Sequence, residues 1–349
     1  MGDWPFETET PLHKLETIYR RLTERLTTSG FPPSALRPVV DAWFYALEGD
    51  ALAAGAAEEN LADEVERLMT ARLTEVSRHA PSFATALREY RTALTSGDEG
   101  TAAAVMAWLG GQPHVAASAR RAVGVRGDLD HFGAFGFLQG LLTVLRDSGH
   151  KGLFVVLDEV ETLQRVRSDA RDKALNALRQ LIDEMHSGRF PGLYLLITGT
   201  PAFFEGQQGV QRLAPLAQRL ATDFTTDPRF DNPRAVQVRL PGFTQESLVG
   251  LGTTIRDLYT DGARDPERIR AVVDNAYVSD LATAVGGALG VAPRLFLKKL
   301  VGDVLDRVDQ FDDFDPRQHY ALTMKAAEMS EVERNAAAGN ADEIELDLP

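Results

Sequence analysis

Two apolar runs decide the fold of this sequence: Leu153-Phe154-Val155-Val156-Leu157-Asp158-Glu159 and Leu193-Tyr194-Leu195-Leu196-Ile197-Thr198-Gly199-Thr200. Their hydrophobic residues follow one another without alternation, which is typical of strands covered on both faces, as in a parallel sheet. Between the runs, residues 169–187 carry apolar side chains at helical spacing. The order strand, helix, strand predicts a βαβ unit with a right-handed crossover, and hence an α/β fold.

Most of the remaining sequence predicts helices. We expect helices at 10–29 and 134–148 and, after a third strand at 235–240, at 244–259, 265–289 and 293–310. The alanine-rich stretch 39–120 predicts several helices, with breaks near Gly49, at Ser96-Gly97 and at Gly110-Gly111-Gln112-Pro113. We therefore expect five parts: a remnant of the α/β core at 1–38, a helical insertion at 39–130, the α/β core at 131–243, a helical lid at 244–325 and an acidic tail at 326–349.

Composition excludes several classes of protein. The 349 residues include 37 basic and 51 acidic side chains, a formal charge of −14, which argues against nucleic-acid binding through bulk positive charge but leaves a local basic face open. The absence of cysteine excludes disulfides, thiolate metal sites and a cysteine nucleophile. No apolar run is long enough to span a membrane, and the first residues do not resemble a signal peptide, so we expect a cytoplasmic protein.

The acid pair Asp158-Glu159 follows the first strand, at the edge of a parallel sheet where ligands bind. An aspartate in this place can hold Mg²⁺, usually through water, and the following glutamate can orient or deprotonate an attacking water, as in a Walker B motif. The alternative is that the acid only caps the following helix. Glu161 either extends the acidic cluster or is a solvated residue at the start of that helix.

Further candidates follow the second strand. Thr198 and Thr200 suit a sensor that bonds a γ-phosphate or the adjacent water, although threonines before a proline also bond the backbone of a turn. Arg219, with Arg212 as its competitor, lies where an arginine finger would reach a neighbouring subunit's nucleotide. Arg294 begins a predicted lid helix, from which it could bridge to phosphate.

The order of these parts resembles the AAA+ ATPases, most closely the origin-recognition-like branch. Longer motifs resemble the ATP-binding proteins of BREX phage-resistance systems, the BrxD-like group. These motifs are residues 9–16, 135–142, 157–163, 172–179, 197–204, 230–234, 240–243 and 292–297. The resemblance implies an AAA+ fold, ATP and Mg²⁺ as ligands, and a role in defence against phage DNA. By position it assigns Asp158 to Mg²⁺ and nucleotide, Glu159 to catalysis, Thr198 or Thr200 to sensor one, Arg219 to the finger and Arg294 to sensor two.

One motif of that family is missing. A P-loop, Gly-x-x-x-x-Gly-Lys-Ser/Thr, cradles phosphate with backbone N–H groups and a lysine, yet the chain has no Gly-Lys dipeptide. We expect that the first strand, the P-loop and its helix are absent from this chain, through truncation or a mis-called start, so that the sheet is incomplete. Strong ATP binding by this chain alone is therefore not expected.

Three functions follow from these features. The first is an ATPase component of a phage-defence system that couples Mg-ATP hydrolysis to action on DNA or on partner subunits, with assembly of several copies of the chain left open. The second is a non-catalytic module that docks partner proteins or DNA. The third is a Mg²⁺-dependent nuclease using Asp158, Glu159 and Glu161, which is disfavoured because all three acids come from one strand end.

Overall fold

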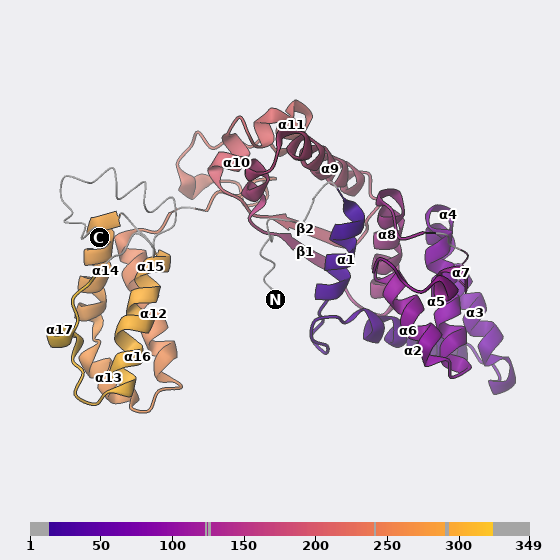
Figure 1. Cartoon of the computed structure of the whole chain (residues 1–349), viewed down its shortest axis with the longest axis horizontal. Helices are drawn as coiled ribbons and strands as arrows, with labels where there is room; N and C mark the ends of the chain where they lie inside the picture. Colours follow the sequence, from indigo (N-terminus) through magenta and orange to yellow (C-terminus); the bar gives the residue numbers. More distant parts are fainter. Residues whose placement is uncertain (1–13, 123, 125–126, 241, 290–292, 324–349) are drawn as a thin grey trace. The chain divides into compact units, whose positions relative to one another are not determined.

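The computed structural model describes residues 14–122, 124, 127–240, 242–289 and 293–323 (Figure 1). The chain divides into two compact units, Met1–Thr222 and Asp223–Pro349. Each unit has a hydrophobic core of its own. The expected beginning of the first helix at 10–13 and the expected tail at 326–349 lie outside the described residues.

The first unit contains the predicted βαβ element. Strand β1 (Leu153–Leu157) pairs in parallel with β2 (Leu193–Ile197), with Leu153 opposite Leu193 and Leu157 opposite Ile197. Helix α9 (Ser168–His186) connects the two strands. The prediction of two neighbouring parallel strands is therefore confirmed.

Only one face of this sheet is covered within the described part of the chain. Alternate side chains of both strands, from Leu153 to Ile197, pack against the core of the unit. The opposite face leaves Phe154, Tyr194 and Leu196 at 47%, 67% and 41% exposure. We expected both faces of the strands to be covered, and this is confirmed for one face only.

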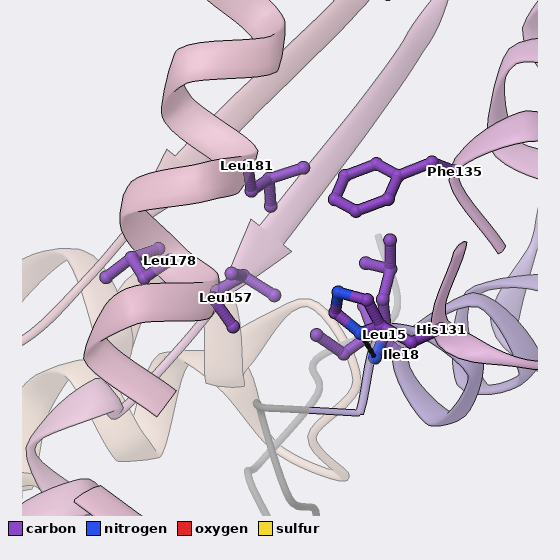
Figure 2. A pocket seen from close by; sticks show the side chains of 8 residues that line it. Leu15, Ile18, His131, Phe135, Leu157, Leu178 and Leu181 are labelled. Carbon is purple, nitrogen blue, oxygen red and sulfur yellow. Dashed lines mark hydrogen bonds between the residues drawn. The ribbon is translucent and has the colours of Figure 1, made fainter. Parts of the chain in front are cut away.

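Leu157, the last residue of β1, joins the sheet to three helices. Figure 2 shows it facing side chains from α1 (Leu15–Arg25), α8 (His131–Asp147) and α9. The space between them is about 10 Å³, roughly the size of one water molecule, and its lining is apolar apart from His131. It is a small packing defect and too small for an organic ligand.

The segments between α1 and α8 are helical, and those with buried side chains share one core with the sheet. They are α2 (Leu36–Ala53), η1 (Glu58–Asn60), α3 (Leu61–Arg72), α4 (Thr74–His79), α5 (Pro81–Thr95), α6 (Glu99–Leu109) and α7 (Ala117–Ala122). The ring of Phe137 on α8 lies at its centre, with centroids 5.8, 5.2 and 5.1 Å from those of Tyr19, Phe83 and Trp108. The helices that follow residue 36 therefore pack around α8, which is the helix against which the sheet packs.

The expected breaks are confirmed at Ser96-Gly97 and at Gly110-Gly111, where α5 and α6 end. The break near Gly49 is wrong. Helix α2 continues to Ala53, because buried side chains such as Leu47 and Ala51 extend its apolar face across Gly49. Helix α1 is shorter than expected and ends at Arg25.

After β2 the first unit has α10 (Pro201–Glu205), η3 (Val210–Arg212) and α11 (Ala214–Leu220). The second unit has η4 (Pro228–Phe230), α12 (Gln245–Thr260), α13 (Pro266–Val272), α14 (Asn275–Leu289), α15 (Pro293–Lys298), the π-helix η5 (Lys299–Leu305), α16 (Asp306–Gln310) and α17 (Pro316–His319). None of the helices in the described part of the chain is long and apolar enough to cross a membrane.

Two expectations for the second unit are wrong. Residues 235–240 form no strand; Val236, Val238 and Leu240 are exposed instead, and Arg239 is bonded to Asp231, 3.0 Å from Nε to Oδ2. The single helix expected at 265–289 is divided between α13 and α14. It breaks because the Asp274 carboxylate accepts the Tyr277 N–H at 2.8 Å and so starts a new helix.

The contact between α5 and α8 gives a test of the packing. A Cβ on Gly140 would lie 2.5 Å from the buried ring of Phe83, so Gly140→Ala overpacks the core and should lower the free energy of unfolding by about 1–3 kcal/mol. The matched control is Gly49→Ala in α2, where nothing lies within 4 Å and a gain of about 0.5–1 kcal/mol is expected. Urea denaturation measures both, and equal effects at the two positions would contradict this packing.

Candidate functional site

The two strands end in polar side chains that contact each other. The Thr198 N–H donates to the Leu157 carbonyl at 2.9 Å, which extends the pairing of β1 and β2 by one residue. The Thr198 hydroxyl then donates to Oδ1 of Asp158. The predicted meeting of an acid and a hydroxyl at the carboxyl ends of the strands is therefore present in the structure.

Glu159 has a strained backbone at this edge. Its φ and ψ are 54° and 41°, a left-handed conformation that costs a non-glycine residue roughly 1–2 kcal/mol. Its N–H lies 3.0 Å from Oδ1 of Asp158 and 3.3 Å from the Thr198 hydroxyl. The side chain is exposed, and among the described residues its carboxylate has no hydrogen bond or ion pair. Such strain is typical of functional positions.

Asp158 can accept a further ligand. Both contacts above use Oδ1, so within the described part of the chain Oδ2 is left without a hydrogen bond. The side chain as a whole is half-buried. A free carboxylate oxygen suits Mg²⁺ or a water bound to it, since hard dications prefer oxygen ligands.

Glu161 does not complete a metal site with the acid pair. It lies in η2 (Val160–Arg165), and its Oε2 is buried with no hydrogen-bond partner in the described residues. A Cβ on Gly199 would lie 3.5 Å from this oxygen and 2.9 Å from Val160, so the two loops meet closely here. No three His, Asp or Glu side chains within the described ranges gather around one point.

Of the two candidate threonines, only Thr198 has a hydrogen bond to the acid pair in the described structure. Thr200 is the N-cap residue of α10, and its side chain makes no capping bond there. Its carbonyl accepts the N–H of Phe203 at 2.9 Å. Thr200 therefore shapes the turn after β2.

Both candidate finger arginines form ion pairs with aspartates of α9. Arg219 binds Asp183, near the end of the helix, and the Pro215 carbonyl at 2.7 Å. Arg212 binds Asp172 and, at 2.7 Å, the Ser168 hydroxyl, both near the start of the helix. The Arg212 hydrogen bond lowers the pKa of the Asp172 carboxyl. Arg212 therefore contacts the beginning of α9, which is the end nearer in sequence to the acid pair. Arg219 contacts the far end of the same helix.

Arg294 belongs to the second unit. It is the second residue of α15 and therefore lies in the first turn of a helix, as expected. Its side chain is exposed. The residues just before that helix, 290–292, lie outside the described structure.

Arg171 and Gln164 connect the loops that follow the two strands, and the sequence did not indicate them. The half-buried Arg171 guanidinium donates to the carbonyls of Leu163, Gln164 and Val166, and the Gln164 side chain donates to Ala202 at 2.8 Å. One signal was available. A cation in the first turn of a helix opposes the helix dipole, so Arg171 needs a compensating partner.

The left-handed backbone at Glu159 gives a second test. Glycine adopts this conformation without a steric cost, so Glu159→Gly should have a free energy of unfolding about 1 kcal/mol higher than Glu159→Ala. Glu161 has a negative φ and is the control, because glycine there should be less stable than alanine. Chemical denaturation of the four variants measures the two differences. The same order at both positions would contradict the assigned conformation of Glu159.

Comparison with known proteins agrees with the motifs of the sequence. No curated protein and no solved structure matches the chain. The model of one protein family, described as the BREX system ATP-binding protein BrxC/D, matches residues 3–324. This match includes both strands, the acid pair and Thr198, as well as most of the second unit. The chain therefore belongs to the family of BREX system ATP-binding proteins BrxC/D.

Proposed function

We propose that the chain is an ATPase component of a BREX-type phage-defence system, and that Asp158, Glu159 and Thr198 act on the phosphate end of Mg-ATP. The observation that carries the proposal is the hydrogen bond between Thr198 and Asp158 at the ends of paired parallel strands, with the exposed Glu159 side chain beside them. Open parallel sheets bind ligands at this edge. Family membership supports ATP as the ligand.

The three side chains have distinct roles in this proposal. Oδ2 of Asp158 would hold Mg²⁺ through water, and the bound ion would neutralise charge on the phosphates. The exposed Glu159 carboxylate would accept a proton from the attacking water. The Thr198 hydroxyl, which donates to Oδ1, would fix the orientation of the Asp158 carboxylate. Coupling of this reaction to DNA or to partner subunits is part of the same proposal.

Phosphate binding requires groups beyond these three. The printed sequence has no Gly-Lys dipeptide and therefore no Gly-x-x-x-x-Gly-Lys-Ser/Thr loop. Each charge-assisted hydrogen bond that such a loop makes to phosphate contributes roughly 1.5–3 kcal/mol. The affinity of the chain for Mg-ATP, measured by calorimetry, therefore tests whether its nucleotide site is sufficient for binding.

Glu159→Gln tests the catalytic role. In an ATPase assay this substitution should lower the rate of ATP hydrolysis by about 10²–10⁴-fold, because an amide cannot accept the proton, while Mg-ATP binding in calorimetry stays unchanged. Glu246→Gln, at an exposed position in the first turn of α12, is the control and should leave both quantities unchanged. No Mg-ATP binding by the wild type, or equal ATPase rates for Glu159→Gln and wild type, would contradict the proposal.

A second function, a non-catalytic module that docks partner proteins, is favoured by the uncovered sheet face. Phe154 and Tyr194 lie there with their ring centroids 5.6 Å apart, and Leu196 is exposed on the same face. Exposed apolar patches of this kind are typical of interaction sites. This function predicts that the 349-residue chain has no ATPase activity of its own, and turnover that Glu159→Gln abolishes would exclude it.

A further inference from the structure

The loops that follow β1 and β2 are fastened together through one arginine. Arg171 donates from Nε to the Leu163 carbonyl at 3.2 Å and from one terminal nitrogen to the carbonyls of Gln164 and Val166 at 2.7 and 2.9 Å. Its other terminal nitrogen donates to the side-chain oxygen of Gln208, in the segment after β2. Four oxygens from two loops thus share one guanidinium group, which has five N–H donors in a rigid plane.

A second contact joins the same loops. The Gln164 side chain donates to the Ala202 carbonyl at 2.8 Å, in the helix that follows Thr200. Arg212, which comes from the β2 side, binds Asp172, the residue next to Arg171. Residues in the first turns of α9 therefore form hydrogen bonds with both loops.

The contacts of Arg171 lie at the C-terminal end of a segment whose N-terminal residue has a strained backbone. The segment begins at Glu159, in its left-handed conformation, and continues through η2 to Val166. At the near end the Glu159 N–H is held by Asp158 and Thr198, and the Val160 N–H donates to the Thr198 carbonyl at 3.2 Å. A strained residue persists only where its surroundings fix it, and here both ends of the segment are fixed.

We propose that Arg171 is a positioning residue that keeps Glu159 in its left-handed conformation and so aims the Glu159 carboxylate at the edge of the sheet. Arg171 acts on backbone carbonyls and does not itself touch the acid pair. It links the loop of the acid pair to the loop of Thr198, so the two halves of the site keep a fixed separation. The effect on catalysis rests on the proposed ATPase function, whereas the effect on the segment 160–166 does not.

The chemistry of the contact explains why an arginine is present. A lysine has one ammonium nitrogen and cannot reach carbonyls on several sides together with the Gln208 side chain, whereas the planar guanidinium can. Arg171 also occupies the first turn of α9, where a cation is unfavourable for the helix itself. The three carbonyl contacts offset that cost, which indicates that the arginine serves the loop and not the helix.

Hydrogen exchange of the full chain, followed by mass spectrometry, tests this proposal without nucleotide. In Arg171→Ala and in Arg171→Lys, backbone amides of residues 160–166 should exchange at least about tenfold faster, while those of β1 and the second half of α9 stay unchanged. Arg179→Ala is the matched control, since Arg179 is equally half-buried on α9 but binds Asp183 at 2.7 Å, and it should leave 160–166 unchanged. If Arg171→Ala does not fold, Arg171→Lys decides the result.

A double substitution separates positioning of Glu159 from general loop stability. Glycine at 159 adopts the left-handed conformation without strain, so Arg171→Lys should accelerate exchange less in a Glu159→Gly background than in wild type. In an ATPase assay, Arg171→Lys should lower the maximal rate of ATP hydrolysis and leave the KM for ATP unchanged. Unchanged exchange at 160–166, or equal acceleration in both backgrounds, would overturn the proposal. An inactive wild type would instead overturn the proposed ATPase function and leave the exchange result to decide the role of Arg171.

Discussion

The site depends on the parallel pairing of β1 with β2. This pairing places Leu157 opposite Ile197, so the next residues of both strands, Asp158 and Thr198, lie side by side. The hydroxyl of one then bonds the carboxylate of the other. A shift of one residue in the register would turn alternate side chains to the opposite face and separate this pair. The apolar contacts that fix the register, such as those of Leu157 with α1, α8 and α9, therefore also fix the polar edge.

The features found from the sequence are those that local pattern determines. Uninterrupted apolar runs identified both strands, helical spacing identified α8, α9 and α12 to within a few residues, and the shared edge of parallel strands brought Asp158 and Thr198 together. Tertiary contact decided the rest. The alternation at 235–240 resembles a strand, but pairing needs a neighbouring strand, which no local pattern can supply.

The same limit applies to the arginines. Arg171 binds backbone carbonyls, which every residue has, so its partners carry no mark in the sequence. Arg219 and Asp183 are 36 positions apart, and their ion pair follows only from the packing of α11 on α9. The helix break at Asp274 could have been predicted, because aspartate is a common N-cap. The helical spacing of apolar residues on both sides of it indicated one continuous helix instead. Side-chain roles were therefore harder to predict than the elements that carry them.

The small size of the sheet has a consequence for handling the protein. In the described structure each strand pairs along one side only, and the other side presents backbone N–H and C=O groups without a strand neighbour. Such edges are templates for association between molecules, and the aromatic side chains of Phe154 and Tyr194 lie next to them. At the concentrations used for crystallisation, aggregation by strand addition is the expected hazard, and charged substitutions on these two aromatic positions are the natural means of suppressing it.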